Sequence, residues 1–134
     1  MQIKKNLWNR IVNKSYEIAS EMDNIYKHMS FILYKSSIVS VGRNYQFKTH
    51  TQAVRMGYRY GFIHSELNAV VNFPFEPAKL RDCVLVNTRV GKNGLLSISR
   101  PCQNCQRMIV AMGFKKVLYT NEFGLLEEFN YEYY

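Results

Sequence analysis

The chain has 134 residues, 47% apolar and 14% aromatic, a composition that excludes a disordered chain and fits one folded domain over residues 1–134. It contains no uninterrupted apolar run of about 18 residues, so we expect no transmembrane helix and no membrane partner. Its basic first residues are followed by neither the apolar run nor the cleavage site of a signal peptide. The three cysteines are an odd number for a disulfide framework, so we expect a cytoplasmic protein.

The charge is spread unevenly along the chain. The formal net charge is +8, yet residues 122–134 contain four acidic residues and no basic one. Residues 1–121 therefore carry 18 basic and 6 acidic residues, a net charge of +12. This excess suits a polyanionic ligand such as a nucleotide phosphate or a single nucleic-acid strand, and it equally serves solubility. Charge alone does not separate these two interpretations.

The first half of the chain is expected to form a helix followed by a hairpin. Apolar side chains recur mostly at steps of three and four over residues 6–27, which predicts an amphipathic helix. Two short β-rich runs, 31–34 and 38–41, flank a polar turn at 35–37 and predict a hairpin. Residues 43–63 are expected to be irregular.

The middle of the chain is expected to contain a short helix and then strands. The helix begins near His64 and covers 64–72, because two prolines follow it. Residues 83–90 predict a strand, and a Gly- and Asn-containing turn at 91–94 leads to an expected returning strand at 95–99.

The last part of the chain is expected to contain one more helix and strand. Pro101 stands where a helix over 102–112 would begin, and Gly113 ends it. Residues 116–120 predict a strand, while 125–134 remain open between strand and helix. Strands separated by helices favour an α/β protein with a mixed sheet covered by helices.

Two cysteines and one histidine have the spacing of a catalytic zinc site. Cys102 and Cys105, three residues apart at the start of a helix, can turn both sulfurs toward one ion. The positive end of the helix favours the thiolate form that binds metal. With His64 they make three ligands for Zn²⁺ and leave a fourth tetrahedral position for water.

Glu66 is the candidate catalytic residue. It is two positions from His64, about 200° apart on a regular helix. Both side chains can face one site only if His64 lies at the helix entry in a non-helical conformation. Glu66 then lies beside the metal without binding it and can move protons.

Two other interpretations of the cysteines remain open. Cys102 and Cys105 can form a redox pair, or they can belong to a structural zinc site whose fourth ligand comes from Cys83, His28 or His50. The proline before the first cysteine and the accompanying H-x-E favour the open zinc site.

Over roughly residues 30–121 the chain resembles the cytidine and deoxycytidylate deaminase superfamily, and most of all the compact members found in phages. The likeness rests on Val41-Gly42-Arg43-Asn44, His64-Ser65-Glu66-Leu67-Asn68-Ala69, Pro101-Cys102-Gln103-Asn104-Cys105-Gln106-Arg107 and Gly113-Phe114-Lys115-Lys116-Val117-Leu118-Tyr119-Thr120. The resemblance implies a three-layer fold in which helices flank a mixed five-stranded sheet, with the metal between two helix N-termini. It also implies a homo-oligomer.

The same resemblance implies substrate-binding residues. It implies that Asn44 hydrogen-bonds the base or sugar, and that the backbone around Ser65 and Pro101 holds the ring. Ser65 departs from the family, which usually has alanine there, and serine is small enough to fit.

The segment 43–63 combines four basic residues with interleaved aromatic ones and contains no acid. Arg43 and His50 are therefore candidates to contact a phosphate, and the aromatic rings can stack on a base. The alternative is a loop packed by its own aromatic side chains with a solvated charged rim.

Three functions fit these features. The first is a zinc-dependent hydrolytic deaminase that converts cytosine to uracil in a free nucleoside or nucleotide, such as cytidine or dCMP. The second is a deaminase of cytosine, less readily of adenine, in single-stranded DNA or RNA, which the net charge of +12 favours. The third, a zinc-stabilised nucleic-acid-binding protein without catalysis, is the least favoured because it gives Glu66 no role.

Overall fold

The computed structural model describes residues 3–23, 26–49, 55 and 62–130. Within them the main sheet consists of β1 (Lys27–Tyr34), β2 (Ser37–Arg43), β5 (Val84–Val90), β6 (Lys116–Thr120) and β7 (Leu126–Glu128). The α-helices are α1 (Lys5–Ser20), α3 (Ser65–Val71) and α4 (Gln103–Met112).

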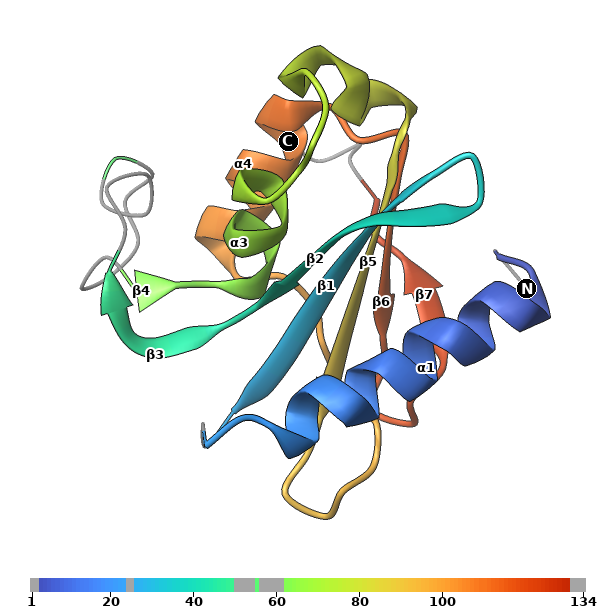
Figure 1. The fold of residues 1–134 in the computed structure, drawn as a ribbon, viewed down its shortest axis with the longest axis vertical. Helices are drawn as coiled ribbons and strands as arrows, with labels where there is room; N and C mark the ends of the chain where they lie inside the picture. Colours follow the sequence, from blue (N-terminus) through green and yellow to red (C-terminus); the bar gives the residue numbers. More distant parts are fainter. Residues whose placement is uncertain (1–2, 24–25, 50–54, 56–61, 131–134) are drawn as a thin grey trace.

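The strands lie in the order β2-β1-β5-β6-β7, with β5 and β6 parallel and the other neighbours antiparallel. Helix α1 covers one face of the sheet, and α3 and α4 cover the other (Figure 1). The expected mixed five-stranded sheet flanked by helices is therefore confirmed. None of the described helices is both long enough and apolar enough to span a bilayer.

Helix α1 is shorter than the helix predicted over 6–27. It ends at Ser20, where the backbone N–H of Glu21 donates to the carbonyl of Ile18 at 3.0 Å. Met22 is buried all the same, because the turn after the helix carries it into the core next to β1. The apolar spacing correctly indicated burial here, but it was wrong about the helix end.

The predicted hairpin is confirmed, with strands longer than the apolar runs. Only Lys35 and Ser36 form its turn, since Ser37 already belongs to β2. Both turn residues have positive φ, 48° and 64°, as a two-residue turn that matches the twist of the flanking strands requires.

A second, two-stranded sheet consists of β3 (Tyr45–Thr49) and β4 (Phe62–Ile63), which pair antiparallel. The expectation that 43–63 is irregular was therefore wrong at both ends of the segment. The pairing joins residues that are distant in the sequence, so no local pattern reveals it. His50 lies outside the described residues.

Helix α3 lies directly on β2, and Gly42 permits this close approach. A Cβ atom at Gly42 would overlap the backbone of Ser65 and Ala69. The hydroxyl of Ser40 donates to the carbonyl of Ala69 at 2.6 Å, which ties the helix to the strand. The helix predicted over 64–72 is thus confirmed and anchored to the sheet at its first turns.

In the second half of the chain, the strands predicted at 83–90 and 116–120 and the helix predicted at 102–112 are confirmed as β5, β6 and α4. Gly113 ends α4 with a left-handed φ of 72°. The open choice between strand and helix is decided in favour of a strand for Leu126–Glu128, which form β7, while 131–134 lie outside the described residues. A 3₁₀ helix over Pro77–Asp82, which was not predicted, precedes β5.

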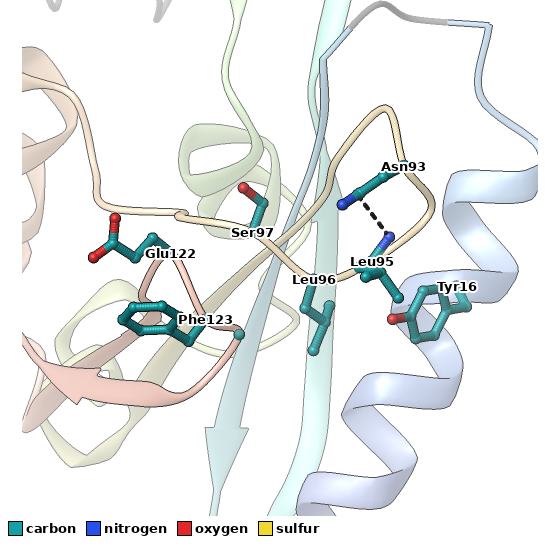
Figure 2. Close-up of a pocket in the computed structure, with 8 residues that line it drawn as sticks. Tyr16, Asn93, Leu95, Leu96, Ser97, Glu122 and Phe123 are labelled. Carbon is teal, nitrogen blue, oxygen red and sulfur yellow. Dashed lines mark hydrogen bonds between the residues drawn. The ribbon is translucent and has the colours of Figure 1, made fainter.

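The prediction of a returning strand at 95–99 is wrong, because these residues form a loop. Only Leu96 forms a single bridge, with Val90, and Ser99 turns inward, where its N–H donates to the carbonyl of Thr120 at 2.9 Å. This loop borders a pocket on the molecular surface (Figure 2). The residues that line the pocket are Tyr16, Asn93, Leu95, Leu96, Ser97, Glu122, Phe123 and Gly124.

Candidate metal centre and active site

Two helix starts bring the predicted metal ligands together. His64 immediately precedes α3 in extended backbone conformation, with φ −84° and ψ 157°. Cys102 precedes α4 in the same way, with φ −66° and ψ 168°, and Cys105 lies in the first turn of α4. The prediction that His64 stands at a helix entry in non-helical geometry is confirmed.

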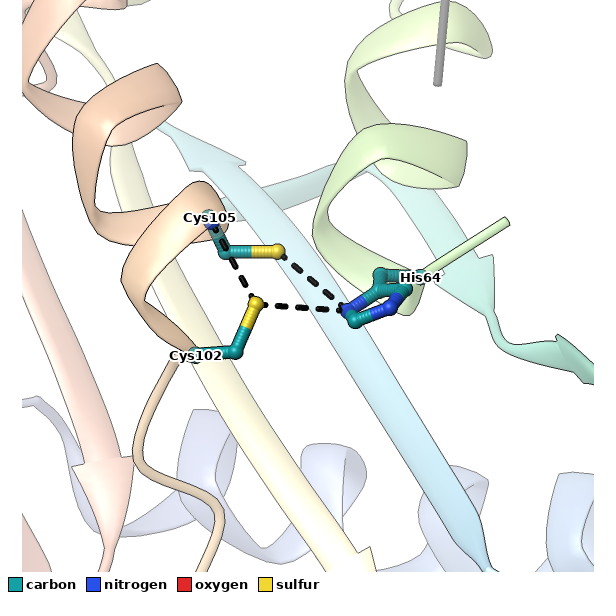
Figure 3. Close-up of side chains that lie close together, drawn as sticks. All are labelled: His64, Cys102 and Cys105. Carbon is teal, nitrogen blue, oxygen red and sulfur yellow. Dashed lines mark hydrogen bonds between the residues drawn. The ribbon is translucent and has the colours of Figure 1, made fainter. Parts of the chain in front are cut away.

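The three side chains point at one another (Figure 3). The Nδ1 atom of His64 lies 3.5 Å from the sulfur of Cys102 and 3.6 Å from that of Cys105, and the potential ligand atoms all lie within 4.8 Å of one another. A sulfur and a nitrogen bound to the same tetrahedral zinc ion lie about 3.6 Å apart, given bond lengths of about 2.3 and 2.1 Å. Distances and donor types therefore both fit one zinc ion.

No fourth ligand joins this group among the residues that the structure describes. Cys83 is buried elsewhere, where its thiol donates to the carbonyl of Lys79. Neither Cys102 nor Cys105 forms a disulfide bond. The described part of the chain thus supports a three-ligand site with an open position, and it supports neither a disulfide nor a closed structural site.

The surroundings favour the metal-binding form of Cys102. Hydrogen bonds from Cys105 and His64 lower the pKa of the Cys102 thiol to about 4, although burial opposes them. Burial lowers the pKa of His64. The hydrogen bond to Cys102 and the negative charge of Cys102 outweigh burial, so the pKa of His64 is raised overall. A cysteine with so low a pKa is a thiolate at neutral pH, which is the form that binds zinc.

Glu66 lies beside this group without belonging to it. Its side chain is 6% exposed, and burial raises the pKa of its carboxyl group. One carboxyl oxygen accepts a hydrogen bond from Ser65 at 3.1 Å, and the other accepts one from the side chain of Asn87 at 3.0 Å. A carboxyl group with a raised pKa next to a metal site can both accept and return a proton.

The residues predicted to bind the substrate lie at two places, at the starts of α3 and α4 and at the end of β2. Ser65 and Pro101 are buried at the starts of α3 and α4, next to the metal ligands. The side chain of Asn44 accepts from the N–H of His28 at 2.9 Å and donates to the carbonyl of Tyr26 at 3.0 Å. These bonds fix the orientation of the Asn44 amide at the end of β2.

The guanidinium of Arg43 lies 3.6 Å from the carboxylate of Glu21, and its backbone N–H donates to Asn68 of α3 at 3.0 Å. The structure thus ties this residue to Glu21, directly after α1, and to α3. A contact of Arg43 with phosphate stays a prediction.

Three polar side chains that sequence analysis did not single out lie with His28 on the face of the sheet that bears Glu66. In the β1–β5 register Ser30 pairs with Asn87, and His28 pairs with Arg89. Burial, followed by the charges of Arg89 and His64, lowers the pKa of His28 to about 4. The one available signal was a serine and an asparagine inside otherwise apolar strand runs.

Arg89 makes an unusual set of contacts for a half-buried cation. Its guanidinium lies 5.4 Å from the centre of the Tyr26 ring. Its Nε atom is buried and has no hydrogen-bond partner among the described residues. Arg89 thus adds positive charge to the side of the sheet that bears the site.

Several solved structures are similar to this one. The dCMP deaminase of cyanophage S-TIM5 in apo form aligns over 90% of this chain and 86% of its own, with 21% identity and a TM-score of 0.53. The structure of that protein in complex with dCMP and dUMP aligns over 90% and 85%, with 21% identity and a TM-score of 0.57. A mutant cytidine deaminase from Mycobacterium tuberculosis aligns over 87% and 91%, with 14% identity and a TM-score of 0.50.

This chain has the cytidine deaminase fold. No protein-family model and no curated protein sequence matches it. On this deaminase fold the His64 group lies between the starts of α3 and α4, where the resemblance placed a metal.

Proposed function

We propose that the chain is a zinc-dependent hydrolytic deaminase that converts cytosine to uracil in a free nucleoside or nucleotide. The observation that carries the proposal is the group of His64, Cys102 and Cys105, with no fourth ligand among the described residues, next to buried Glu66. The cytidine deaminase fold supports it, and so does the similarity to a phage protein seen in complex with dCMP and dUMP.

The reaction adds water across the N3–C4 double bond of cytosine. The bond from C4 to the exocyclic amino group then breaks, which releases ammonia and leaves a carbonyl group at C4. His64, Cys102 and Cys105 would hold the zinc ion, which would supply a water molecule made more acidic and ready to attack. Glu66 takes one proton from the attacking water and delivers it to the ring nitrogen N3. It then takes the second proton from the new hydroxyl group at C4 and delivers it to the amino group as the C4–N bond breaks. Its raised pKa lets it hold the proton between these transfers.

The substrate-binding residues that we propose are those that the sequence resemblance and the basic segment predict. The backbone at Ser65 and Pro101 lines the ring position, and Asn44 contacts the base or sugar from the end of β2. Arg43 and His50 are proposed for the phosphate.

The test is a product assay with the zinc-loaded protein. Cytidine, dCMP, dCTP and a cytosine-containing oligonucleotide are each incubated with it, and uracil products and ammonia are measured. We expect turnover of a free nucleoside or nucleotide. Conversion of the oligonucleotide alone would instead establish the single-strand deaminase that the net charge of +12 over residues 1–121 favours.

The matched control is Glu66→Gln, which keeps the size of the side chain and removes its proton transfer. We expect kcat to fall by roughly 10²–10⁴-fold, because that is the usual contribution of general acid–base catalysis. Zinc content and melting temperature should stay near those of the wild type. A Glu66→Gln protein with wild-type turnover would refute the catalytic assignment.

A further inference from the structure

Glu66 closes a ring of side-chain hydrogen bonds with three residues outside the metal group. The hydroxyl of Ser30 lies 2.6 Å from Oδ1 of Asn87 and 2.8 Å from the hydroxyl of Ser65. Ser65 in turn reaches one oxygen of Glu66 at 3.1 Å, and Nδ2 of Asn87 reaches the other at 3.0 Å. All four side chains are buried, none more than 6% exposed.

We propose that Ser30 and Asn87 are positioning residues that hold the Glu66 carboxylate in its reactive orientation. The inference rests on the proposed function. Asn87 acts directly on one carboxylate oxygen, and Ser30 acts through Ser65 on the other. Each oxygen of the carboxyl group is thereby held by a hydrogen bond, which restrains rotation about the terminal bond of the side chain.

The sheet fixes the positions of Ser30 and Asn87. Ser30 and Asn87 are register partners on the adjacent central strands β1 and β5, so their separation is set by backbone pairing. The amide of Asn87 has one possible orientation, because its oxygen faces the hydroxyl of Ser30 and its nitrogen faces Glu66 and, at 3.4 Å, the carbonyl of Ser99. Sites supported by strands hold their geometry better than sites on loops.

Stability alone gives little reason for polar residues at these two positions. On the same face of the sheet the next register pair, Ile32 and Leu85, is apolar and fully buried, which shows that this face packs well with apolar side chains. In a buried polar network, every polar group needs a hydrogen-bond partner to offset the free energy lost when its hydration is removed. Here the network ends on Glu66, a carboxylate next to the candidate metal ligands, where orientation affects a reaction rate.

The test compares kcat, KM, zinc content and melting temperature of the zinc-loaded wild type, Asn87→Ala, Ser30→Ala and Ser30→Thr. We expect Asn87→Ala to lower kcat by roughly 10²-fold at similar KM and full zinc content, because misplacement of a catalytic group by about 1 Å has this cost. Ser30→Ala should lower kcat less. Ser30→Thr, which keeps the hydroxyl, should restore most of that loss.

Thr88→Val is the matched control. Thr88 follows Asn87 in β5, and its fully buried hydroxyl bonds to Ser15 at 2.7 Å on the opposite face of the sheet. Its removal should lower stability and leave kcat unchanged.

Wild-type kcat in folded, zinc-loaded Asn87→Ala or Ser30→Ala would overturn the positioning role alone. Equal losses in Ser30→Ala and Ser30→Thr would also overturn it, since the hydroxyl would then not matter. If Asn87→Ala fails to fold, the two Ser30 variants decide, because they change fewer atoms. A wild type that converts no cytosine substrate overturns the proposed function itself.

Discussion

The two faces of the β1–β5 strand pair differ in the side chains that they bury: one face is mainly apolar and the other is polar beside the candidate site. Toward α1 these strands present Met29, Phe31 and Val86, all fully buried in an apolar cluster. Toward α3 and α4 they present Ser30 and Asn87, equally buried but hydrogen-bonded to one another and onward to Glu66. Because strand side chains alternate, one pair of strands supplies a stabilising core on one side and a support for the site on the other.

Buried polarity is not by itself what distinguishes the face that bears the site. The α1 face also contains a buried pair, Ser15 and Thr88, whose hydroxyls lie 2.7 Å apart. Ser15 donates as well to the carbonyl of Ile11 within its own helix. Ser15 and Thr88 therefore find their hydrogen-bond partners locally. The pair of Ser30 and Asn87 instead connects by hydrogen bonds to Glu66, a titratable group beside the candidate metal ligands.

The largest expected effect comes from Cys105→Ser on the site face. Removal of one of three ligands should abolish both stoichiometric zinc binding and turnover. Zinc per chain is measured by elemental analysis, and melting temperature is measured with and without a chelator. Free zinc at about a thousand times its Kd stabilises the folded protein by about 4 kcal/mol, so the wild type should lose that stabilisation on chelation and the variant should show no such change. Full zinc content in Cys105→Ser would contradict the assignment.

On the opposite face, Ile11→Ala should lower the free energy of unfolding by about 2–5 kcal/mol, because it leaves a cavity in the cluster beneath α1. Its kcat per folded molecule should equal that of the wild type. Denaturant titration and a kinetic assay below the melting temperature check both points. Asn13→Ala, at an exposed position of the same helix, is the control and should change neither. A loss of kcat in folded Ile11→Ala would show that the two faces are coupled.

Gly42→Ala should affect stability and activity together. The new methyl group would overlap the backbone of Ser65 and Ala69, and α3, which carries Glu66, has to shift away from β2. We expect a loss of about 1–3 kcal/mol in the free energy of unfolding, with a fall in kcat in the molecules that remain folded. Gly91→Ala, whose added Cβ meets its nearest atom at 3.2 Å in a loop away from the metal ligands, is the comparison. Unchanged kcat in Gly42→Ala would show that the site tolerates movement of α3.

The smallest effect concerns the pH dependence of stability. The pKa of His28 is about 4 in the folded protein, below its ordinary value of 6.5. Between these values the unfolded chain binds a proton that the folded chain does not, so His28 makes stability rise with pH across this window and fall as the solution is acidified. Unfolding titrations at about pH 4.5 and pH 7 should show a larger acid loss for the wild type than for His28→Gln. Equal losses would contradict the buried, neutral state of His28.

Local sequence patterns were sufficient for the features that depend on neighbouring residues. The spacing of Cys102 and Cys105 at a helix start, and the position of His64 before another, follow from helix geometry and were confirmed. The hairpin turn and the left-handed Gly113 are also local. The sequence by itself therefore determined the candidate metal-ligand group and most of the described helices and strands.

Only the tertiary structure decided the features that depend on partners distant in the chain. The end of α1 at Ser20, the pairing of β3 with β4 and the loop conformation of residues 95–99 all departed from the apolar and β-rich patterns. The support of Glu66 is the clearest case. Ser30 and Asn87 are 57 positions apart, and they meet only because the β1–β5 register makes them partners. Register is a property of the folded sheet, so residue type alone could not reveal which side chains hold the carboxylate.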